Sequence, residues 1–320
     1  MSAPLALDAD AVFAACGPTA AVEAITAALT AGLDPAADPP RHAVPLRSGQ
    51  FLLMPSEGAS GSGYVGVKVA TVAPDNPARG LPRVQASYLL FDAGTLGLVA
   101  VLDGTALTTL RTPAVSVAAV APRLLAGTGP VAVAVYGAGP QAHGHVATLA
   151  AVLAPHRPVG SVSHLVRDGH RARARTVDGA EVVPLDGPRA RDVVSAADVV
   201  VCATSARTPL FDADLIAATA AVIAVGSHEP DARELPAALL ARATVVVEDV
   251  ATALREAGDV CLAIDEQAVR PADLTPMRDV VTGRTRPDPG RPLVFKSVGM
   301  SWEDLVVAEA VLRGFRTLRR

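Results

Sequence analysis

The sequence predicts an α/β protein that combines a Rossmann-type, doubly wound parallel sheet with an α+β substrate-binding domain. A buried strand, a glycine turn and a helix follow one another without interruption at residues 131–152. Strand and helix patterns alternate from there to about residue 292, as a doubly wound sheet requires. Hydrophobic residues make up 50% of the chain and are mostly Ala and Val, which suits parallel sheet and helix.

The N-terminal part begins with a helix and continues with alternating strands. Pro18–Ala31 places Val22, Ile25 and Leu29 on one helix face, and Gly32 stops the helix. The predicted strands of this part are Phe51–Pro55, Gly66–Ala70, Val84–Phe91 and Leu98–Leu102. A long helix, roughly 106–125, leads to the glycine turn, and its Pro113 should bend it or mark its true start.

The second part has the rhythm of a parallel sheet. Its predicted strands after the glycine turn are Ser161–Val166, Glu181–Leu185, Asp198–Ala203, Ala221–Val225 and Thr244–Glu248. Trp302–Leu318 is an amphipathic helix with no place in that sheet, so we expect it to pack on the first domain. We therefore predict an α+β domain of residues 1–112 and 296–320, to which substrate binding and dimerisation are assigned by the resemblance described below, and a dinucleotide-binding domain of residues 113–295.

The glycine turn predicts a dinucleotide-binding site. Gly137 allows the tight turn after the strand, and Gly139 lets the backbone approach a phosphate. Pro140 and Gln141 open the following helix, whose N-terminus offers N–H groups and a positive dipole end to a pyrophosphate. Ala142 replaces the usual third glycine and is still small. We expect a dinucleotide cofactor.

Composition excludes several classes of function. The formal net charge of −4 gives no basic field for nucleic acid, and no apolar run reaches membrane-spanning length unbroken. Residues 1–10 lack the features of a signal peptide, and the three cysteines are widely spaced, which favours a cytoplasmic protein with reduced thiols. His143 and His145 are expected at the surface, and their spacing predicts no metal site.

Several segments together resemble the ornithine cyclodeaminase and mu-crystallin family. They are Leu53–Pro55, Gly66–Val69, Asp103–Thr112, Tyr136–Ala142 and Phe295–Gly299. The similarity runs in collinear order from about residue 40 to the C-terminal helix, and its most specific part is the Leu-Thr-Thr-Leu-Arg-Thr block that ends at Thr112. The resemblance implies a nicotinamide-dependent enzyme acting on a small imino or amino acid, and a homodimer formed through the N-terminal domain.

The resemblance also implies the substrate-site residues. Arg41 matches the arginine that binds the substrate carboxylate, although Arg47 lies close to it and is an alternative. Lys68 matches the lysine beside the reacting nitrogen, and Met54 a residue that lines the pocket. A lysine on the sheltered face of a strand can exchange a proton near neutral pH. Because such a lysine contributes little to the core, we expect Lys68→Ala to fold normally.

Two further matches connect substrate and cofactor. Arg111 matches the arginine between the substrate and the cofactor phosphate, and Thr112 lies next to it on the cofactor. The sequence departs from the cyclodeaminases at His228, where they carry an aspartate. A histidine can move a proton but supplies no fixed negative charge to a cationic imine. Glu229 and Asp231 are nearby acids, whereas Glu234 is expected to be structural.

These residues favour reduction of a 2-imino acid, with Lys68 or His228 supplying or relaying the proton. An amino-acid dehydrogenase of the alanine type and a redox-neutral cyclodeaminase are the alternatives within the family. A non-catalytic protein that binds cofactor or a small ligand, in the manner of a crystallin, is the alternative of another class.

The end of the second predicted strand favours NADP(H) over NAD(H). An NAD-type site would carry an acid where Val166 stands, whereas Arg167 follows, with His170 and Arg171 beyond. Asp168 could instead bind the ribose, and NAD(H) is the alternative that this interpretation leaves open. Further cofactor contacts are expected at Thr204, Ser205, Val225, Gly226 and Ser297.

Overall fold

The structure is a computed structural model that describes residues 3–58, 62–167 and 179–320. The chain divides into two compact units, with Met1–Ala114 and Met300–Arg320 in unit 1 and Val115–Gly299 in unit 2. Compared with the predicted boundaries, Pro113 and Ala114 belong to unit 1, and residues 296–299 belong to unit 2.

Unit 1 is built on a six-stranded sheet with the strand order β1-β6-β5-β4-β3-β2. Its strands are β1 (Leu5–Leu7), β2 (His42–Leu46), β3 (Gly49–Ser56), β4 (Tyr64–Val72), β5 (Val84–Asp92) and β6 (Leu98–Asp103). Of the described pairs in this sheet, β1 with β6 is parallel and the others are antiparallel. The strands β1 and β2 were not predicted, because β1 is very short and every residue of β2 is exposed, so neither has a burial alternation to detect.

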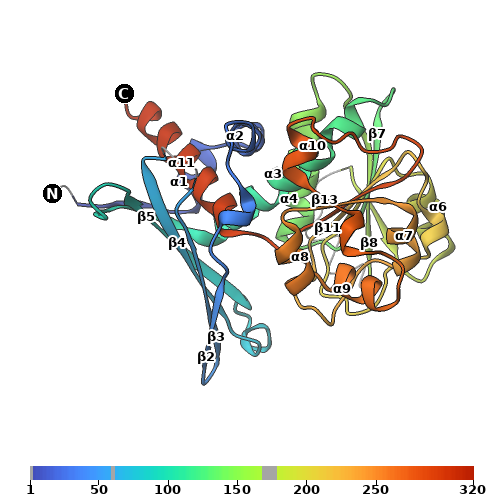
Figure 1. Cartoon of the computed structure of the whole chain (residues 1–320), viewed down its shortest axis with the longest axis horizontal. Helices are drawn as coiled ribbons and strands as arrows, with labels where there is room; N and C mark the ends of the chain where they lie inside the picture. Colours follow the sequence, from blue (N-terminus) through green and yellow to red (C-terminus); the bar gives the residue numbers. More distant parts are fainter. Residues whose placement is uncertain (1–2, 59–61, 168–178) are drawn as a thin grey trace. The chain divides into compact units, whose positions relative to one another are not determined.

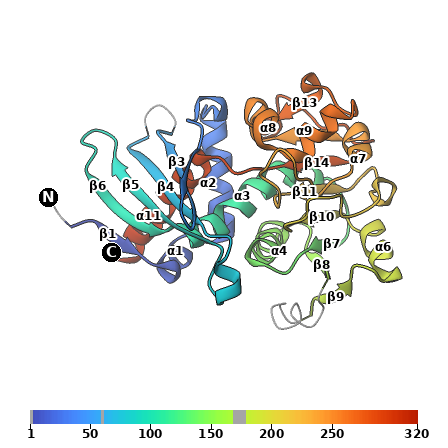
Figure 2. The same ribbon diagram turned by 90° about the horizontal axis from the view of Figure 1, so that it is seen from below.

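Three helices pack in unit 1 with this sheet: α1 (Ala9–Ala15), α2 (Pro18–Thr30) and α11 (Ser301–Leu318). The last of them contacts α1, α2 and the strands β3, β4 and β5 (Figures 1 and 2). The expectation that the C-terminal helix packs on the first domain is confirmed, since α11 is part of unit 1. Short 3₁₀ helices, η1 (Pro35–Ala37) and η2 (Asn76–Arg79), lie in the connections.

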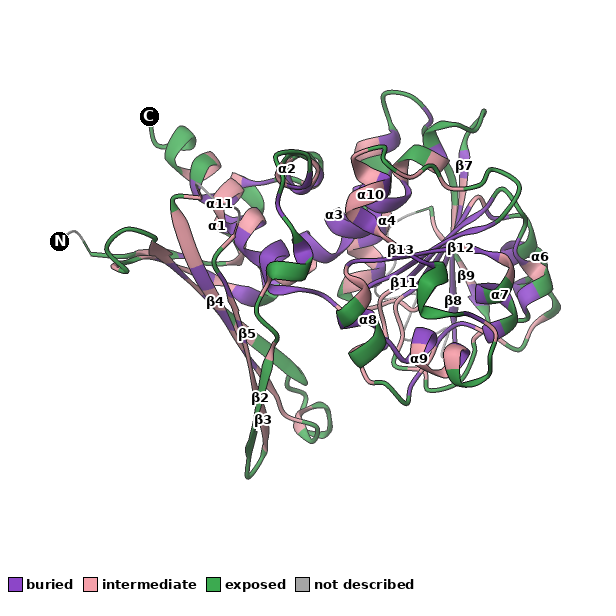
Figure 3. Cartoon of the chain, in the orientation of Figure 1, coloured by how far each residue is buried: buried purple, intermediate pink, exposed green. Residues whose placement is uncertain are grey.

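The two faces of the unit 1 sheet differ in burial. Register places Met54, Lys68, Tyr88 and Leu102 opposite one another on successive strands, and all four are buried. The alternate positions Leu53, Val67, Val69, Leu89 and Val101 form the other face and are only half-buried (Figure 3). Lys68 therefore lies on the face that packs against α11.

The helix α3 spans Gly104–Leu125, two residues earlier than the predicted start at Ala106. Pro113 stands inside this helix rather than at its start. The chain then enters unit 2, where the strand-turn-helix pattern is observed as β7 (Val131–Tyr136) and α4 (Pro140–Leu153).

Unit 2 contains an eight-stranded sheet with the order β13-β12-β14-β11-β10-β7-β8-β9, in which all pairs are parallel. The other strands are β8 (Val159–Val166), β9 (Glu181–Pro184), β10 (Val199–Cys202), β11 (Ala221–Ala224), β12 (Thr244–Val247), β13 (Leu274–Pro276) and β14 (Leu293–Lys296). The helices are α6 (Pro188–Ser195), α7 (Ala237–Arg242), α8 (Val250–Glu256), α9 (Gly258–Asp265) and α10 (Met277–Val281), with 3₁₀ turns η3 (Ala213–Leu215) and η4 (Pro271–Asp273). Buried Val, Ala and Ile side chains of the inner strands form its core (Figure 3). The predicted fold class is confirmed.

The strand order indicates a position for ligand binding. The chain runs from β7 outward to β8 and β9, and then returns to β10 on the other side of β7. Ligands of open parallel sheets bind at the carboxyl ends of the strands where the order reverses in this way. The turn after β7, which contains Gly137, lies at that point.

Within the described residues, no single helix has both the length and the hydropathy to cross a membrane. The helices α1 and α2 meet those criteria only as a pair, which is bent by 70°. Cys16 and Cys202 are buried free thiols, and Cys261 is half-buried.

Candidate active site

The glycine turn of unit 2 has the geometry of an anion-binding helix N-terminus. Gly137 has φ of +111°, and a Cβ there would lie 2.7 Å from the carbonyl oxygen of Ala203, so only glycine fits. Gly139 is the N-cap of α4, no side chain caps that helix, and a Cβ at Gly139 would meet open space. Pro140 occupies the first turn, where its missing N–H is not needed. These residues fit a dinucleotide whose pyrophosphate faces the helix N-terminus.

Two histidines form hydrogen bonds that hold the glycine turn and the start of α4 in place. His164 of β8 donates from Nδ1 to the carbonyl oxygen of Gly137 at 2.8 Å. His145 donates from Nδ1 to the carbonyl oxygen of Gln141 at 2.7 Å, and its Nε2 accepts from the Ser116 hydroxyl at 3.0 Å. Burial lowers the pKa of His145 to about 4, so the ring is neutral at physiological pH.

The expectation that His143 and His145 are surface residues is therefore wrong for His145, which is fully buried, and His143 is half-buried. Helical spacing does not reveal which side of α4 faces α3. In the described part of the chain, no group of three or more His, Cys, Asp or Glu side chains is placed to bind a metal ion.

The second strand ends at the same edge of the sheet as the glycine turn. β8 pairs in parallel with β7 and ends at the buried Val166, and the next residue, Arg167, is exposed. The apolar end of this strand and the cation after it lie as the sequence predicted. Asp168, His170 and Arg171 lie outside the described residues.

Glu234 connects the two loops that carry most of the remaining predicted cofactor residues. It is fully buried and accepts hydrogen bonds from the Thr204 backbone N–H at 2.8 Å and from the Thr204 hydroxyl at 2.7 Å. It also accepts from the Gly226 N–H at 2.7 Å. A Cβ at Gly226 would lie 2.1 Å from the Thr204 carbonyl oxygen, so the loops touch. Ser205 and Val225 adjoin these contacts and are exposed and half-buried, respectively. Burial raises the pKa of Glu234.

A buried lysine stabilises the loops at the carboxyl ends of the unit 2 strands. Lys296, at the end of β14, pairs through Nζ with Asp259 Oδ2 at 2.9 Å and donates to the Ser227 carbonyl oxygen at 2.5 Å. Asp259 Oδ1 in turn accepts the N–H groups of Glu234 and Leu235, both at 2.7 Å. Sequence reasoning missed this network, although a lysine that ends an apolar strand is a usable signal.

His228 is exposed in the loop that follows Ser227. The two acids considered beside it are both held by Arg207, which pairs with Glu229 at 2.6 Å and with Asp231 at 2.5 Å. Both carboxylates are therefore already paired with Arg207. To take the role of the cyclodeaminase aspartate, either one would have to break that ion pair.

Ser297 is buried, and its hydroxyl donates to Glu248 Oε1 at 2.7 Å. Glu248 also accepts the N–H groups of Val298 and Gly299, at 2.8 and 2.9 Å. The hydroxyl of Ser297 thus stabilises the turn after β14, and a cofactor contact of this residue stays a prediction.

In unit 1, the cross-strand pair Met54–Lys68 forms the centre of the predicted substrate site. Arg41 immediately precedes β2, whose first pair joins His42 to Leu53, so continuing the register places Arg41 beside Met54. Arg47 lies in the exposed turn at the far end of the same hairpin. The geometry favours Arg41 over Arg47 as the arginine that would bind the substrate carboxylate together with Lys68.

Lys68 and Arg111 are buried and paired with two carboxylates of α11. Lys68 Nζ lies 2.7 Å from Asp304 Oδ2 and 3.4 Å from Thr108 Oγ1. Arg111 pairs with Glu303 at 2.5 Å and, through Nε, with Asp304 Oδ1 at 3.3 Å. Burial and the charge of Arg111 lower the pKa of Lys68 to about 8, although Asp304 and Glu303 raise it.

This arrangement corrects the expectation that Lys68 contributes little to the core. Its side chain is only 4% exposed, and removing it would leave Asp304 buried without that partner. Thr112 follows Arg111 on α3 and is also buried. Sequence reasoning missed Glu303 and Asp304, because two acids in the first turn of an amphipathic helix also suit a solvated helix start.

A loop residue holds the start of α11. Asp38 accepts the Trp302 N–H through Oδ2 at 2.8 Å, which caps the helix from a distant part of the sequence. Asp38 lies three residues before Arg41, so the cap also ties the segment that leads to Arg41 to the helix that carries Asp304. Burial raises the pKa of Asp38 to about 6.

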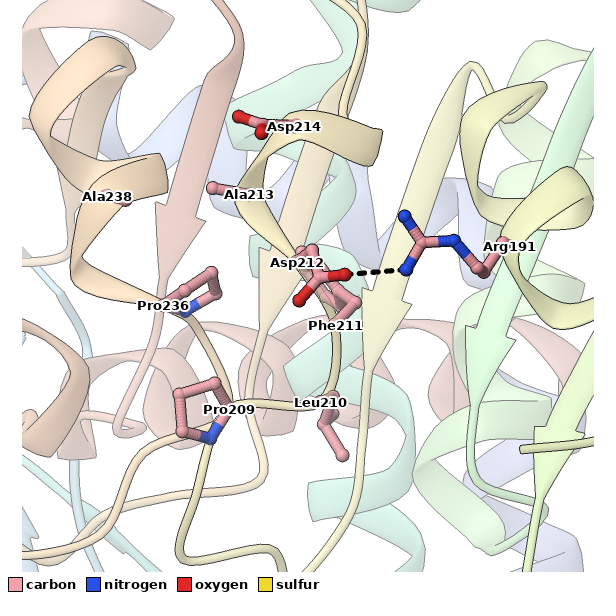
Figure 4. A pocket seen from close by; sticks show the side chains of 9 residues that line it. All are labelled: Arg191, Pro209, Leu210, Phe211, Asp212, Ala213, Asp214, Pro236 and Ala238. Atoms are coloured by element: carbon pink, nitrogen blue, oxygen red, sulfur yellow. Dashed lines mark hydrogen bonds and ion pairs between the residues drawn. The ribbon is translucent and has the colours of Figure 1, made fainter. Parts of the chain in front are cut away.

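Unit 2 also has a surface pocket of about 570 Å³, but none of the predicted site residues lines it. Figure 4 shows Arg191 pointing at Asp212, and the two pair at 2.6 Å. Phe211, also in the lining, stacks on Tyr136 with ring centroids 5.5 Å apart. Arg191 is already paired with Asp212, and Asp214 adds a further carboxylate, so this pocket is a poor match for the carboxylate of an imino acid.

Comparisons with known proteins agree on one family. The family described as "Ornithine cyclodeaminase/mu-crystallin family" matches residues 10–316. Delta(1)-pyrroline-2-carboxylate reductase 2 of Burkholderia ambifaria is 34% identical over 275 residues, covering 83% of this chain and 81% of the relative. Ketimine reductase mu-crystallin of Mus musculus is 32% identical over 279 residues, covering 85% of this chain and 83% of the relative. An archaeal alanine dehydrogenase dimer with bound NAD has a TM-score of 0.84 and 25% identity, covering 99% of this chain and 97% of that chain.

Proposed function

The chain belongs to the ornithine cyclodeaminase/mu-crystallin family, and we propose that it is an NAD(P)H-dependent reductase of small 2-imino acids. The observation that carries this proposal is Lys68, a buried cation on the sheltered face of the unit 1 sheet with a pKa of about 8. Such a group gives up a proton near neutral pH, as reduction of an imine requires. The names of the two sequence relatives, both imine reductases, support it.

We assign the substrate carboxylate to three cations. Arg41 offers a bidentate guanidinium fork, and Lys68 and Arg111 add charge from the paired cluster under α11. Met54 stands directly across from Lys68 and would line the pocket. The substrate carboxylate would share these cations with the carboxylates of α11.

When bound, a reduced nicotinamide dinucleotide supplies a hydride to the imine carbon, with two electrons, and is left oxidised. The ammonium of Lys68 gives its proton to the imine nitrogen and becomes a neutral amine, which solvent protonates again. His228 is the alternative donor. Comparing Lys68→Arg with His228→Gln separates the two, because arginine keeps the charge but does not release the proton.

The dinucleotide would be held by Gly137, Gly139, Pro140 and Gln141 at the N-terminus of α4. A Cβ at Gly139 would meet open space there, whereas Gly137 packs tightly against Ala203, so the turn has room for a ligand on the side of the helix N-terminus. Thr112, Thr204, Ser205, Val225, Gly226 and Ser297 are the further proposed contacts.

NADP(H) is our proposed preference, because Arg167 follows a strand that ends in Val166 rather than in an acid. The NAD named with the archaeal structure supports the competing choice. Binding of NADPH and NADH to the wild type, Arg167→Ala and the exposed control Arg286→Ala decides between them. Only Arg167→Ala should lose about tenfold in affinity for NADPH. Tighter NADH binding by the wild type would refute the preference.

Turnover tests the main proposal. Purified protein, NADPH or NADH, and Δ1-pyrroline-2-carboxylate or Δ1-piperideine-2-carboxylate should give a fall in the absorbance of the reduced cofactor. Tight cofactor binding without oxidation, across a panel of imino acids, would favour a binding protein instead. Conversion of ornithine without net oxidation would favour a cyclodeaminase.

A homodimer through unit 1 is the proposed assembly. The sheet face opposite α11 carries Leu53, Val67, Val69, Leu89 and Val101 as half-buried apolar side chains, which a second copy of the face would cover. Leu89→Lys should give a monomer in sedimentation at micromolar concentration, and Leu254→Lys, at an exposed site on α8, should not. A monomeric wild type would contradict the assembly.

A further inference from the structure

We propose that Asp304 is a positioning residue for the proposed reaction: it holds Lys68 in place and keeps it protonated at neutral pH. The inference rests on the proposed function, in which Lys68 gives a proton to the imine nitrogen. Asp304 belongs to the first turn of α11, and its partner belongs to the sheet, so the C-terminal helix would control the chemistry of a strand residue.

The carboxylate of Asp304 bridges both buried cations. Its Oδ2 lies 2.7 Å from Lys68 Nζ, and its Oδ1 lies 3.3 Å from Arg111 Nε. Glu303 contacts Arg111, and Thr108 gives Lys68 its longer second contact. Asp304 is thus placed to fix the position of the Lys68 ammonium relative to the guanidinium.

The charges around Lys68 act in opposite directions on its protonated form. Burial and the nearby Arg111 act against the protonated lysine, whereas Asp304 and Glu303 favour it, and the pKa remains about 8. Tyr88 faces Lys68 from β5, and burial followed by the charge of Asp304 raises the pKa of its phenol, so it stays neutral. Without Asp304, two buried cations would share one carboxylate.

Asp304 is fully buried, and the fold places positive charge around it. It lies in the first turn of α11, where the positive end of the helix dipole favours a carboxylate. The two cations of the cluster add to this effect. Asp38, whose carboxylate accepts the Trp302 N–H, holds that helix end in place.

Composition supports the choice of residue. The sequence contains 26 arginines and only two lysines, Lys68 and Lys296. Arginine does not release its proton at physiological pH, so a cation on β4 that gives up a proton cannot be one of these arginines. The same composition makes the proton affinity of Lys68 directly measurable, because lysine-selective isotope labelling gives two side-chain signals.

The decisive experiment is a pH titration of ¹³C,¹⁵N-lysine-labelled protein by NMR, with Lys296→Arg used to assign the signals. In Asp304→Asn the Lys68 signal should titrate about one to two pH units lower than in the wild type. Glu309→Gln is the matched control, since Glu309 is on the same helix but bonds to Ser62. An unchanged midpoint in Asp304→Asn would overturn the proposal.

Two other variants keep the test decisive if Asp304→Asn does not fold. Arg111→Met should raise the Lys68 midpoint, because it removes the second cation, and Asp304→Glu should keep it near the wild-type value. A lower midpoint in Arg111→Met, or one in Asp304→Glu that falls as far as expected for Asp304→Asn, would overturn the proposal.

The kinetic arm asks whether this coupling serves the reaction. For imine reduction, kcat/KM should fall as the pH rises through about 8, and in Asp304→Asn this limb should move down with the NMR midpoint. If the NMR midpoint of Lys68 moves in Asp304→Asn but the fall of kcat/KM stays at the same pH, the role of Asp304 in the reaction is refuted. If the wild type reduces no imino acid, the proposed function fails, and the NMR titration still decides whether Asp304 controls Lys68.

Discussion

The two lysines of the chain differ in what surrounds them. Lys68 in unit 1 shares its site with another cation, Arg111, and with two carboxylates of one helix. Lys296 in unit 2 has Asp259 as its ion-pair partner, and its ammonium also donates to a backbone carbonyl. Both are almost inaccessible to solvent.

The difference teaches that burial alone does not make a lysine reactive. A second cation beside Lys68 lowers the cost of losing its proton. Lys296 instead contacts a carboxylate and a backbone carbonyl oxygen. In the proposed function Lys68 transfers a proton, whereas Lys296 holds the backbone of the loop at Ser227.

Replacing each lysine by arginine should separate the two roles most strongly. Lys68→Arg keeps a positive charge next to Asp304 but cannot give up a proton, so turnover should fall by about 10²–10⁴-fold while the protein folds. Lys296→Arg should keep most of the activity. The measurements are kcat and thermal melting, and equal losses of turnover in both variants would contradict the distinction.

Removing the charge at Lys296 should instead affect stability. Lys296→Met leaves Asp259 buried without its ion partner, which should lower the free energy of unfolding by about 3–5 kcal/mol. Urea denaturation measures this. The double variant Lys296→Met/Asp259→Asn should recover part of the loss, and a double variant as unstable as the sum of both changes would argue against a coupled pair.

His145 sharpens the comparison, because this buried base is bonded to a carbonyl and a hydroxyl rather than to a carboxylate. Its pKa is about 4 in the folded state, below the ordinary value of 6.5, so the unfolded chain binds the proton more tightly. Stability should therefore fall as the pH drops from about 6.5 towards 4, by on the order of a few kcal/mol. His145→Gln should reduce this pH dependence of the melting temperature, and the exposed control His156→Gln should leave it unchanged.

The smallest effect is expected at Glu234, which acts through the backbone of two loops. Glu234→Gln can accept fewer of the hydrogen bonds from Thr204 and Gly226, so we expect KM for the cofactor to rise about tenfold with little change in kcat. Steady-state kinetics with varied cofactor measures this. A loss confined to kcat would place Glu234 nearer to the chemistry than the structure does.

The sequence alone determined the fold class, the strands β7 to β12 of the parallel sheet and the glycine turn, whereas the short strand β13 was not predicted. These features are local: the pattern of a buried strand, Gly137 and a helix lies within about 20 residues, and periodicity reports it directly. It also predicted that α11 belongs with the first unit, because an amphipathic helix must cover an apolar surface. The resemblance, rather than periodicity, implied Lys68 and Arg111 as site residues, and their roles stay a prediction.

Only the tertiary structure decided what those cations contact. Asp304 is 236 residues from Lys68 along the chain, and Glu303 is 192 residues from Arg111. Nothing in the local pattern of either segment encodes that pairing, and the pKa of a lysine depends on the charges and the burial that the fold places around it. The same reason explains His145, which local spacing could not distinguish from a surface residue. Folding brings distant charges together in a medium of low dielectric, and the chemistry of Lys68 follows from that environment.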